Sequence, residues 1–132
     1  MIECIFKFNF EKFHNKILDD IENKFGLTLV KDDGLPTHIT LKYPFQAKNI
    51  KELETTINKF TQNHSKAQLF ATKFNNFNHN TIFIDIQASK KAKSIISQFN
   101  LCLKKILWIP RNEFEDNNLH LHSTVVMNSQ NH

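Results

Sequence analysis

Two short stretches with alternating side chains constrain the fold of this chain most strongly. Residues 38–41 read HITL and residues 122–125 read HSTV, so each is His-x-Thr followed by an aliphatic residue in a run typical of a β-strand. Side chains alternate between the two faces of a strand, so each histidine shares a face with the threonine two positions later. At about 3.3 Å per residue the two lie about 7 Å apart, which lets one phosphate-sized group contact both. The sequence thus predicts two strands that each present an imidazole and a hydroxyl.

This combination of side chains suits acid–base chemistry. Imidazole changes charge near neutral pH, so one histidine can accept a proton while another donates one. Threonine hydroxyls can hydrogen-bond phosphate oxygens, and the arrangement requires no metal. A single His-x-Thr occurs often by chance, but two copies on strand-like runs in opposite halves of the chain favour a joint site. His38 and His122 are therefore the candidate catalytic residues, with Thr40 and Thr124 as candidate substrate-binding residues.

The segments around the two motifs, residues 36–45 (PTHITLKYPF) and 119–126 (LHLHSTVV), resemble those of the 2H phosphoesterase superfamily. That superfamily includes the bacterial 2′-5′ RNA ligase-like proteins and the cyclic phosphodiesterases. Its pattern is two His-x-Thr/Ser-hydrophobic motifs, one in each lobe of a two-lobed α+β fold. The resemblance covers nearly the whole chain, because the order of elements between the motifs also fits. It implies largely antiparallel sheets with helices packed outside and a central cleft.

Two features of the sequence depart from the family pattern. A proline often stands directly before the family's histidine, whereas Thr37 and Leu121 hold those places here. The family also continues past the second motif with more structure, whereas this sequence ends at His132. On this resemblance we expect either a minimal member or a chain that lacks the final strand or helix.

The resemblance also implies a function, which is metal-independent cleavage of RNA-type phosphodiesters such as a 2′,3′-cyclic phosphate or a 2′-5′ linkage. One histidine would act as base and the other as acid, and the sequence does not assign these roles. Lys42 shares the parity of His38 and Thr40, so it is either a substrate-binding residue or a solvated lysine, and His120 is expected to line the cleft. No cofactor is expected, and the chain has no glycine-rich phosphate loop for ATP. The expected partner is RNA or a nucleotide.

The wider composition fits a protein with one core. We expect a single domain over residues 1–132 and an α+β fold. The formal net charge of +4 is compatible with an anionic substrate but is common among proteins. Cys4 and Cys102 form no Cys-x-x-Cys pair, and no signal peptide or membrane-spanning run is visible. A monomeric cytoplasmic protein without membrane contact is therefore expected.

Hydrophobic periodicity predicts the order of elements. Helices are expected at residues 11–25, 49–63 and 89–107, and strands at 2–10, 27–30, 37–45, 67–77, 81–88 and 119–127. Within the first helix, Phe13 and Phe25 belong to the apolar stripe and Gly26 is a plausible stop. His14 falls beside that stripe and is expected at the helix surface or its boundary.

Two other functions compete with the phosphodiesterase interpretation. His120 and His122 form a His-x-His pair that can chelate zinc or iron, but a third ligand is needed. The nearest carboxylates lie in the preceding loop: Glu113, Glu115 and Asp116. A mildly basic chain with thirteen phenylalanines can also bind RNA without turnover, through charge and stacking.

Overall fold

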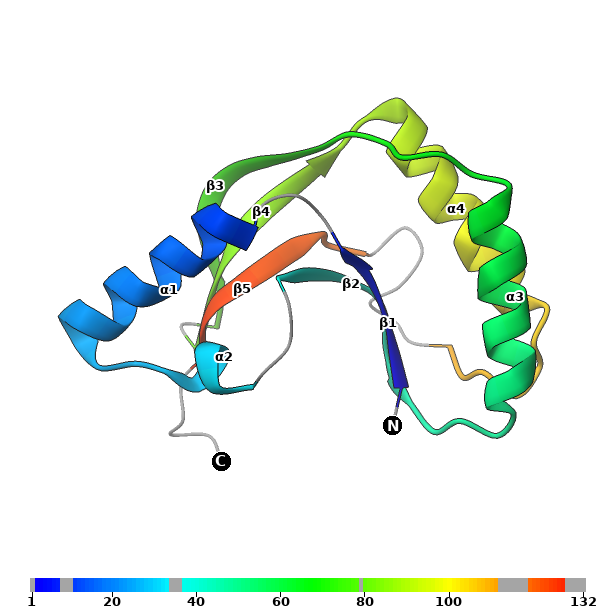
Figure 1. The fold of residues 1–132 in the computed structure, drawn as a ribbon, viewed down its shortest axis with the longest axis horizontal. Coiled ribbons are helices and arrows are strands. Elements are labelled where there is room, and N and C mark those ends of the chain that lie inside the picture. Colours follow the sequence, from blue (N-terminus) through cyan, green and yellow to red (C-terminus); the bar gives the residue numbers. More distant parts are fainter. Residues whose placement is uncertain (1, 8–10, 34–36, 79, 112–118, 128–132) are drawn as a thin grey trace. The chain divides into compact units, whose positions relative to one another are not determined.

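The computed structural model describes residues 2–7, 11–33, 37–78, 80–111 and 119–127 (Figure 1). It confirms the predicted α+β class. The elements in chain order are β1 (Ile2–Lys7), α1 (Glu11–Phe25), α2 (Leu29–Asp32), β2 (His38–Phe45), α3 (Ile50–Gln62), β3 (Leu69–Phe77), β4 (Thr81–Ala88), α4 (Lys90–Lys104) and β5 (His122–Met127). β1 pairs with β2, and a second sheet has the order β3-β4-β5. Among the described helices, none is long and apolar enough to cross a membrane.

The chain divides into two compact units, and each is assembled from three separate segments. Unit 1 comprises Met1–Cys4, Leu41–Phe70 and Gln87–His120, whereas unit 2 comprises Ile5–Thr40, Ala71–Ile86 and Leu121–His132. Unit 1 therefore contains α3 and α4, and unit 2 contains α1, α2 and β5. The division passes through β2 between Thr40 and Leu41. The single domain expected over residues 1–132 stays a prediction.

In unit 2, β5 is covered by helices on one side. Both α1 and α2 contact β5, as Figure 1 shows. β5 pairs with β4 in antiparallel register, and a register shift falls between Ile82 and Phe83. The extra residue is Val125 of β5, which lies between the partners of Ile82 and Phe83.

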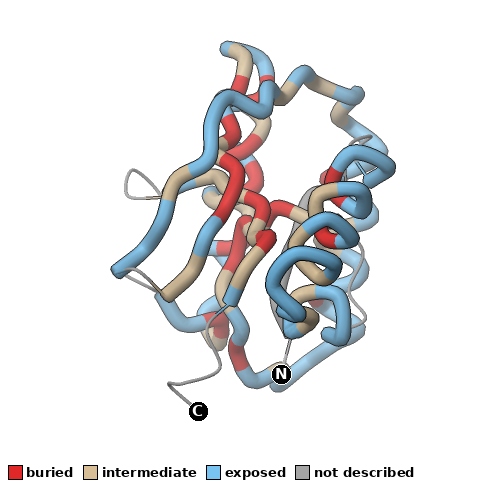
Figure 2. Tube along the Cα trace, turned by 90° about the vertical axis from the view of Figure 1, so that its left-hand side faces the viewer, coloured by how far each residue is buried: buried red, intermediate tan, exposed pale blue. Residues whose placement is uncertain are grey.

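In unit 1, α3 and α4 lie side by side (Figure 1). Their contact includes an edge-to-face pair of Phe60 and Phe99, with ring centroids 5.3 Å apart. Buried positions recur every three or four residues along α4, at Ala92, Ile96, Phe99 and Leu103. Figure 2 shows buried, intermediate and exposed residues along the whole described chain. Ser89 caps α4 as predicted, because its side chain accepts a hydrogen bond from the Ala92 amide.

The structure corrects the sequence-based expectations for α1. Its buried residues are His14 and Leu18, whereas Phe13 and Phe25 are 52% and 71% exposed. The apolar stripe is thus rotated toward His14, whose ring nitrogens find hydrogen-bond partners inside unit 2. Gly26 does end the helix, with φ +66°.

Two further boundaries differ from the prediction. The strand expected at residues 27–30 is instead the start of the short helix α2, which is closed by a bond from the Asp32 amide to the Thr28 carbonyl. Lys31 of α2 pairs with Asp19 and Glu22 of α1, which connects the short helix to α1. The final strand begins at His122 rather than at residue 119.

Candidate functional site

The second motif presents its histidine and threonine on one face of β5. Ser123 and Val125 are buried, whereas His122 and Thr124 are half-buried. In the antiparallel register Asp85 lies opposite His122, and Phe83 lies opposite Thr124. Directly paired residues point to the same side of a sheet, so these four side chains share a face. The predicted parity of the second motif is therefore confirmed.

Two phenyl rings hold the imidazole of His122. Its ring centroid lies 5.0 Å from that of Phe83 and 5.1 Å from that of Phe77, the latter in an edge-on arrangement. Phe77 and Phe83 also contact each other, with centroids 4.1 Å apart. Because Phe83 is fully buried, this cluster restricts the orientations that the imidazole can adopt.

Asp85 adds a carboxylate to the same face. Its side chain accepts a hydrogen bond of 3.2 Å from the Asn75 amide on β3. The backbone carbonyl of Asp85 also accepts from the Thr72 hydroxyl at 3.2 Å. These contacts fix Asp85 within the sheet, opposite His122. Asp85 is therefore a candidate for orienting the imidazole of His122, its paired neighbour on the same face.

The first motif shows the same alternation on β2. Ile39 is fully buried, and His38 and Thr40 are half-buried on the other parity. Both polar residues belong to unit 2, as do His122 and Thr124. The structure thus places all four predicted site residues in one unit, whereas the resemblance implies one motif per lobe.

His14 is a site residue that the sequence prediction missed. It is 5% exposed, and its Nε2 lies 2.9 Å from the carbonyl oxygen of Thr124. Its Nδ1 lies 3.1 Å from the hydroxyl oxygen of Thr37, the residue before His38. Because a carbonyl only accepts, Nε2 carries the proton and Nδ1 accepts from the Thr37 hydroxyl. One side chain of α1 therefore connects the two motif strands.

The surroundings of His14 keep its imidazole neutral. Burial lowers its pKa from 6.5, and the nearby His38 lowers it further, although the bond to the Thr124 carbonyl acts in the opposite direction. The expectation that His14 lies at the helix surface is therefore wrong. The signal in the sequence was its spacing from Ile17, Leu18 and Ile21, which places it on the buried face of a helix.

Lys42 and His120 belong to unit 1 rather than unit 2. Lys42 is 5% exposed, and its ammonium donates to the carbonyl of Pro110. The alternation of β2 ends there, because Leu41 and Lys42 are both buried. The interpretation of Lys42 as a solvated lysine is therefore wrong. His120 is exposed and precedes β5.

The described residues give little support to a metal site or to a serine nucleophile. Within the described ranges no group of three or more His, Cys, Asp or Glu side chains could hold a metal ion. The acidic residues Glu113, Glu115 and Asp116 lie outside the described residues. Ser123 is 1% exposed on the face opposite His122 and Thr124, so its hydroxyl points away from the candidate site.

No protein-family model matches the chain, and comparison with curated proteins and with solved structures finds no match.

Proposed function

We propose that the chain is a metal-independent phosphodiesterase of the 2H phosphoesterase type. Its substrate is an RNA-type phosphodiester, either a 2′,3′-cyclic phosphate or a 2′-5′ linkage, carried by RNA or a nucleotide. The two-lobed fold with a central cleft, the monomeric state and the cytoplasmic location implied by the sequence are parts of the same proposal. No cofactor takes part.

The observation that supports this proposal best is the bridge made by His14. Its two ring nitrogens bond the Thr124 carbonyl of the second motif and the Thr37 hydroxyl beside the first motif. His38 is near enough to influence the pKa of His14. One buried side chain therefore bonds a residue of the second motif and the residue that precedes the first motif. This is the arrangement that a joint His/Thr site needs.

For a cyclic phosphate the reaction proceeds through attack of water on phosphorus. His38 or His122 removes a proton from the water as its oxygen bonds to phosphorus. The bond between phosphorus and one ribose oxygen breaks, and the second histidine gives that oxygen a proton. The product is a phosphate monoester beside a ribose hydroxyl, and the two histidines exchange their protonation states. For a 2′-5′ linkage the adjacent 3′-hydroxyl replaces water as the nucleophile.

Thr40 and Thr124 hold the phosphate during this reaction. Each hydroxyl donates a hydrogen bond to a non-bridging oxygen, where negative charge builds up in the transition state. The backbone of Thr124 is fixed by His14, and the ring of His122 is fixed by Phe77 and Phe83. Pre-set donors and acids of this kind need no reorganisation during the reaction.

The test is hydrolysis of a small substrate panel in excess EDTA. The panel contains 2′,3′-cyclic mononucleotides, an RNA ending in a cyclic phosphate, and 2′-5′ oligoadenylate. We expect EDTA-resistant turnover that falls about 10²–10⁴-fold in His38→Ala and in His122→Ala. His64→Ala, which removes an imidazole of unit 1, is the matched control and should keep full turnover. Turnover that EDTA abolishes, or that survives both site variants, contradicts the proposal.

A non-catalytic RNA-binding function is the second candidate, favoured by exposed aromatic side chains on β3. Phe74 is 58% exposed, and Phe77 on the same strand is 37% exposed. An exposed ring can stack on a base. RNA binding without turnover of any panel member, weakened by Phe74→Ala, would favour this function.

A further inference from the structure

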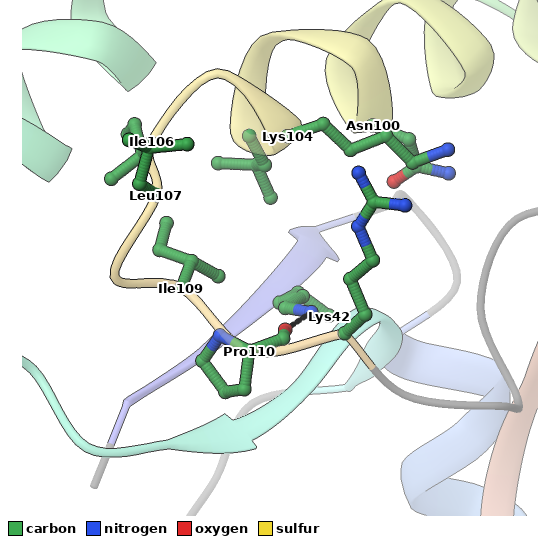
Figure 3. A pocket seen from close by; sticks show the side chains of 9 residues that line it. Lys42, Asn100, Lys104, Ile106, Leu107, Ile109 and Pro110 are labelled. Carbon is green, nitrogen blue, oxygen red and sulfur yellow. Dashed lines mark hydrogen bonds between the residues drawn. The ribbon is translucent and has the colours of Figure 1, made fainter.

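Unit 1 contains a pocket that the proposed reaction does not use. It lies where the C-terminal part of α4 meets the segment that follows it (Figure 3). Its lining residues are Lys42, Asn100, Leu103, Lys104, Ile106, Leu107, Ile109, Pro110 and Arg111. All nine of these described lining residues belong to unit 1.

The pocket has a polar end and an apolar end. Asn100 and Lys104 are four residues apart on α4, a spacing that places both side chains on one face of a helix. In Figure 3 these two side chains extend toward the same end of the pocket, and Ile106, Leu107 and Ile109 lie at the other end. A polar end with an amide and an ammonium can donate several hydrogen bonds to one acceptor group.

The charge of the lining is positive. Lys42, Lys104 and Arg111 contribute three cationic side chains, and no described lining residue is acidic. The C-terminal end of α4 opposes them with a partial charge equivalent to only about half an elementary charge. The ammonium of Lys42 is buried and held by the Pro110 carbonyl, so water and salt screen its field less than that of a surface lysine. The lining therefore favours an anion.

The size of the pocket limits which anion it takes. Its volume is about 110 Å³. An apolar cavity of about 150 Å³ is known to hold benzene, so this pocket is smaller than one that holds an aromatic ring. A tetrahedral phosphate fits better than a base, and an arginine offers it paired N–H donors.

We propose that this pocket is a second anion-binding site, which takes one phosphate group through Lys42, Asn100, Lys104 and Arg111. The phosphate belongs either to a nucleic-acid backbone or to a free phosphate compound, because both present the same oxygens. This inference is independent of the proposed phosphodiesterase reaction.

The experiment measures binding by the full chain carrying both His38→Ala and His122→Ala. That background removes both catalytic imidazoles and so prevents turnover, and binding at the Thr40 and Thr124 hydroxyls is common to the parent, test and control variants. One arm titrates inorganic phosphate, and the other titrates a single-stranded DNA oligonucleotide, which has no 2′-hydroxyl to react. The test variant adds Lys104→Gln and Arg111→Gln, both at exposed positions, and the control variant adds Lys105→Gln. Lys105 is an exposed neighbour of Lys104 that does not line the pocket.

We expect the affinity for at least one probe to fall about tenfold for each cation removed, because a charge-assisted bond contributes about that factor. The control variant should bind as tightly as its parent. Loss in the oligonucleotide arm assigns the site to a nucleic-acid backbone, and loss in the phosphate arm alone assigns it to a free phosphate compound. If neither probe binds, or if Lys105→Gln weakens binding as much as the test variant, the pocket is not an anion site.

Discussion

Two histidines, one in each unit, have hydrogen-bond partners at both ring nitrogens, and yet their pKa values shift in opposite directions. His14 in unit 2 donates to a carbonyl and accepts from a hydroxyl, whereas His64 in unit 1 faces two acceptors. The acceptors of His64 are the Phe60 carbonyl and the Gln98 side-chain oxygen. Burial lowers the pKa of His14, and the bonds to Gln98 and Phe60 raise the pKa of His64.

The difference shows how hydrogen-bond partners select the charge of an imidazole. A neutral ring has one donor and one acceptor, which is what Thr124 and Thr37 require of His14. Two acceptors require two donors, which only the protonated ring of His64 supplies. A neutral His14 places no extra positive charge beside His38.

Removal of the Phe83 ring, which contacts the imidazole of His122, should have the largest effect on stability. Phe83 is fully buried, and we expect Phe83→Ala to lower the free energy of unfolding by about 3–5 kcal/mol. Urea unfolding measures this change. Phe83→Leu keeps most of the volume and should cost less than about 1.5 kcal/mol, while still freeing one side of the imidazole. If Phe83→Leu leaves both kcat and KM of the best substrate unchanged, the ring does not orient His122.

Loss of the His14 bridge should be the next largest effect. His14→Ala leaves the Thr124 carbonyl and the Thr37 hydroxyl without this partner, and we expect a loss of about 2–3 kcal/mol in unfolding free energy. His14→Asn can still donate to a carbonyl and should recover part of it. Equal stability of His14→Ala and wild type would show that the bridge does not hold the strands together.

Turnover separates a positioning role for His14 from a purely structural one. The proposed site predicts that kcat of folded His14→Ala falls more than 1/KM, because the substrate-binding hydroxyls remain present. Turnover is measured without urea, at a temperature at which circular dichroism shows both wild type and His14→Ala to be folded. An unchanged kcat in the folded variant would confine His14 to stability.

The pH dependence of stability should follow from the lowered pKa of His14. The unfolded chain binds its proton near pH 6.5, and folded His14 binds it only at lower pH. Its contribution is therefore complete above pH 6.5 and is lost as the pH falls from there through the lowered pKa. Wild type should lose stability over this range more steeply than His14→Asn. Parallel curves for the two proteins would contradict a neutral, buried His14.

His64 should show the smallest effect and the opposite sign. Its raised pKa makes its contribution complete below pH 6.5, and that contribution is lost as the pH rises through the raised value. Because His64 lies at the surface, the change should be close to the limit of detection by unfolding. Titration of the His64 ring protons by NMR is the better measurement. A midpoint below pH 6.5 would contradict the hydrogen bonds of His64 to Phe60 and Gln98.

Most of the fold that could be predicted from the sequence was indicated by strand alternation and helix periodicity. The alternation at Ile39 and Ser123 correctly separated the buried parity from that of the two motifs. The register shift at Phe83 could not be predicted, because it depends on pairing between β4 and β5 rather than on either strand alone.

The candidate site was predictable only where a motif marked it. His14 carries no motif, and its role depends on a carbonyl 110 positions away in the sequence. Lys42 has the parity of the motif residues, but its hydrogen bond to Pro110 depends on the path of the chain after α4. Such long-range partners set burial and charge, and local patterns do not encode them.

The central claim is that the two motifs form one catalytic site, and a double-mutant cycle on turnover tests it most directly. Turnover of the best substrate in EDTA is measured for wild type, His38→Ala, His122→Ala and the variant with both changes. Groups that act as a unit are strongly non-additive, so the double variant should be no more than about tenfold slower than the slower single variant. Losses that multiply fully would show that the two histidines act independently, and that result would contradict a joint site.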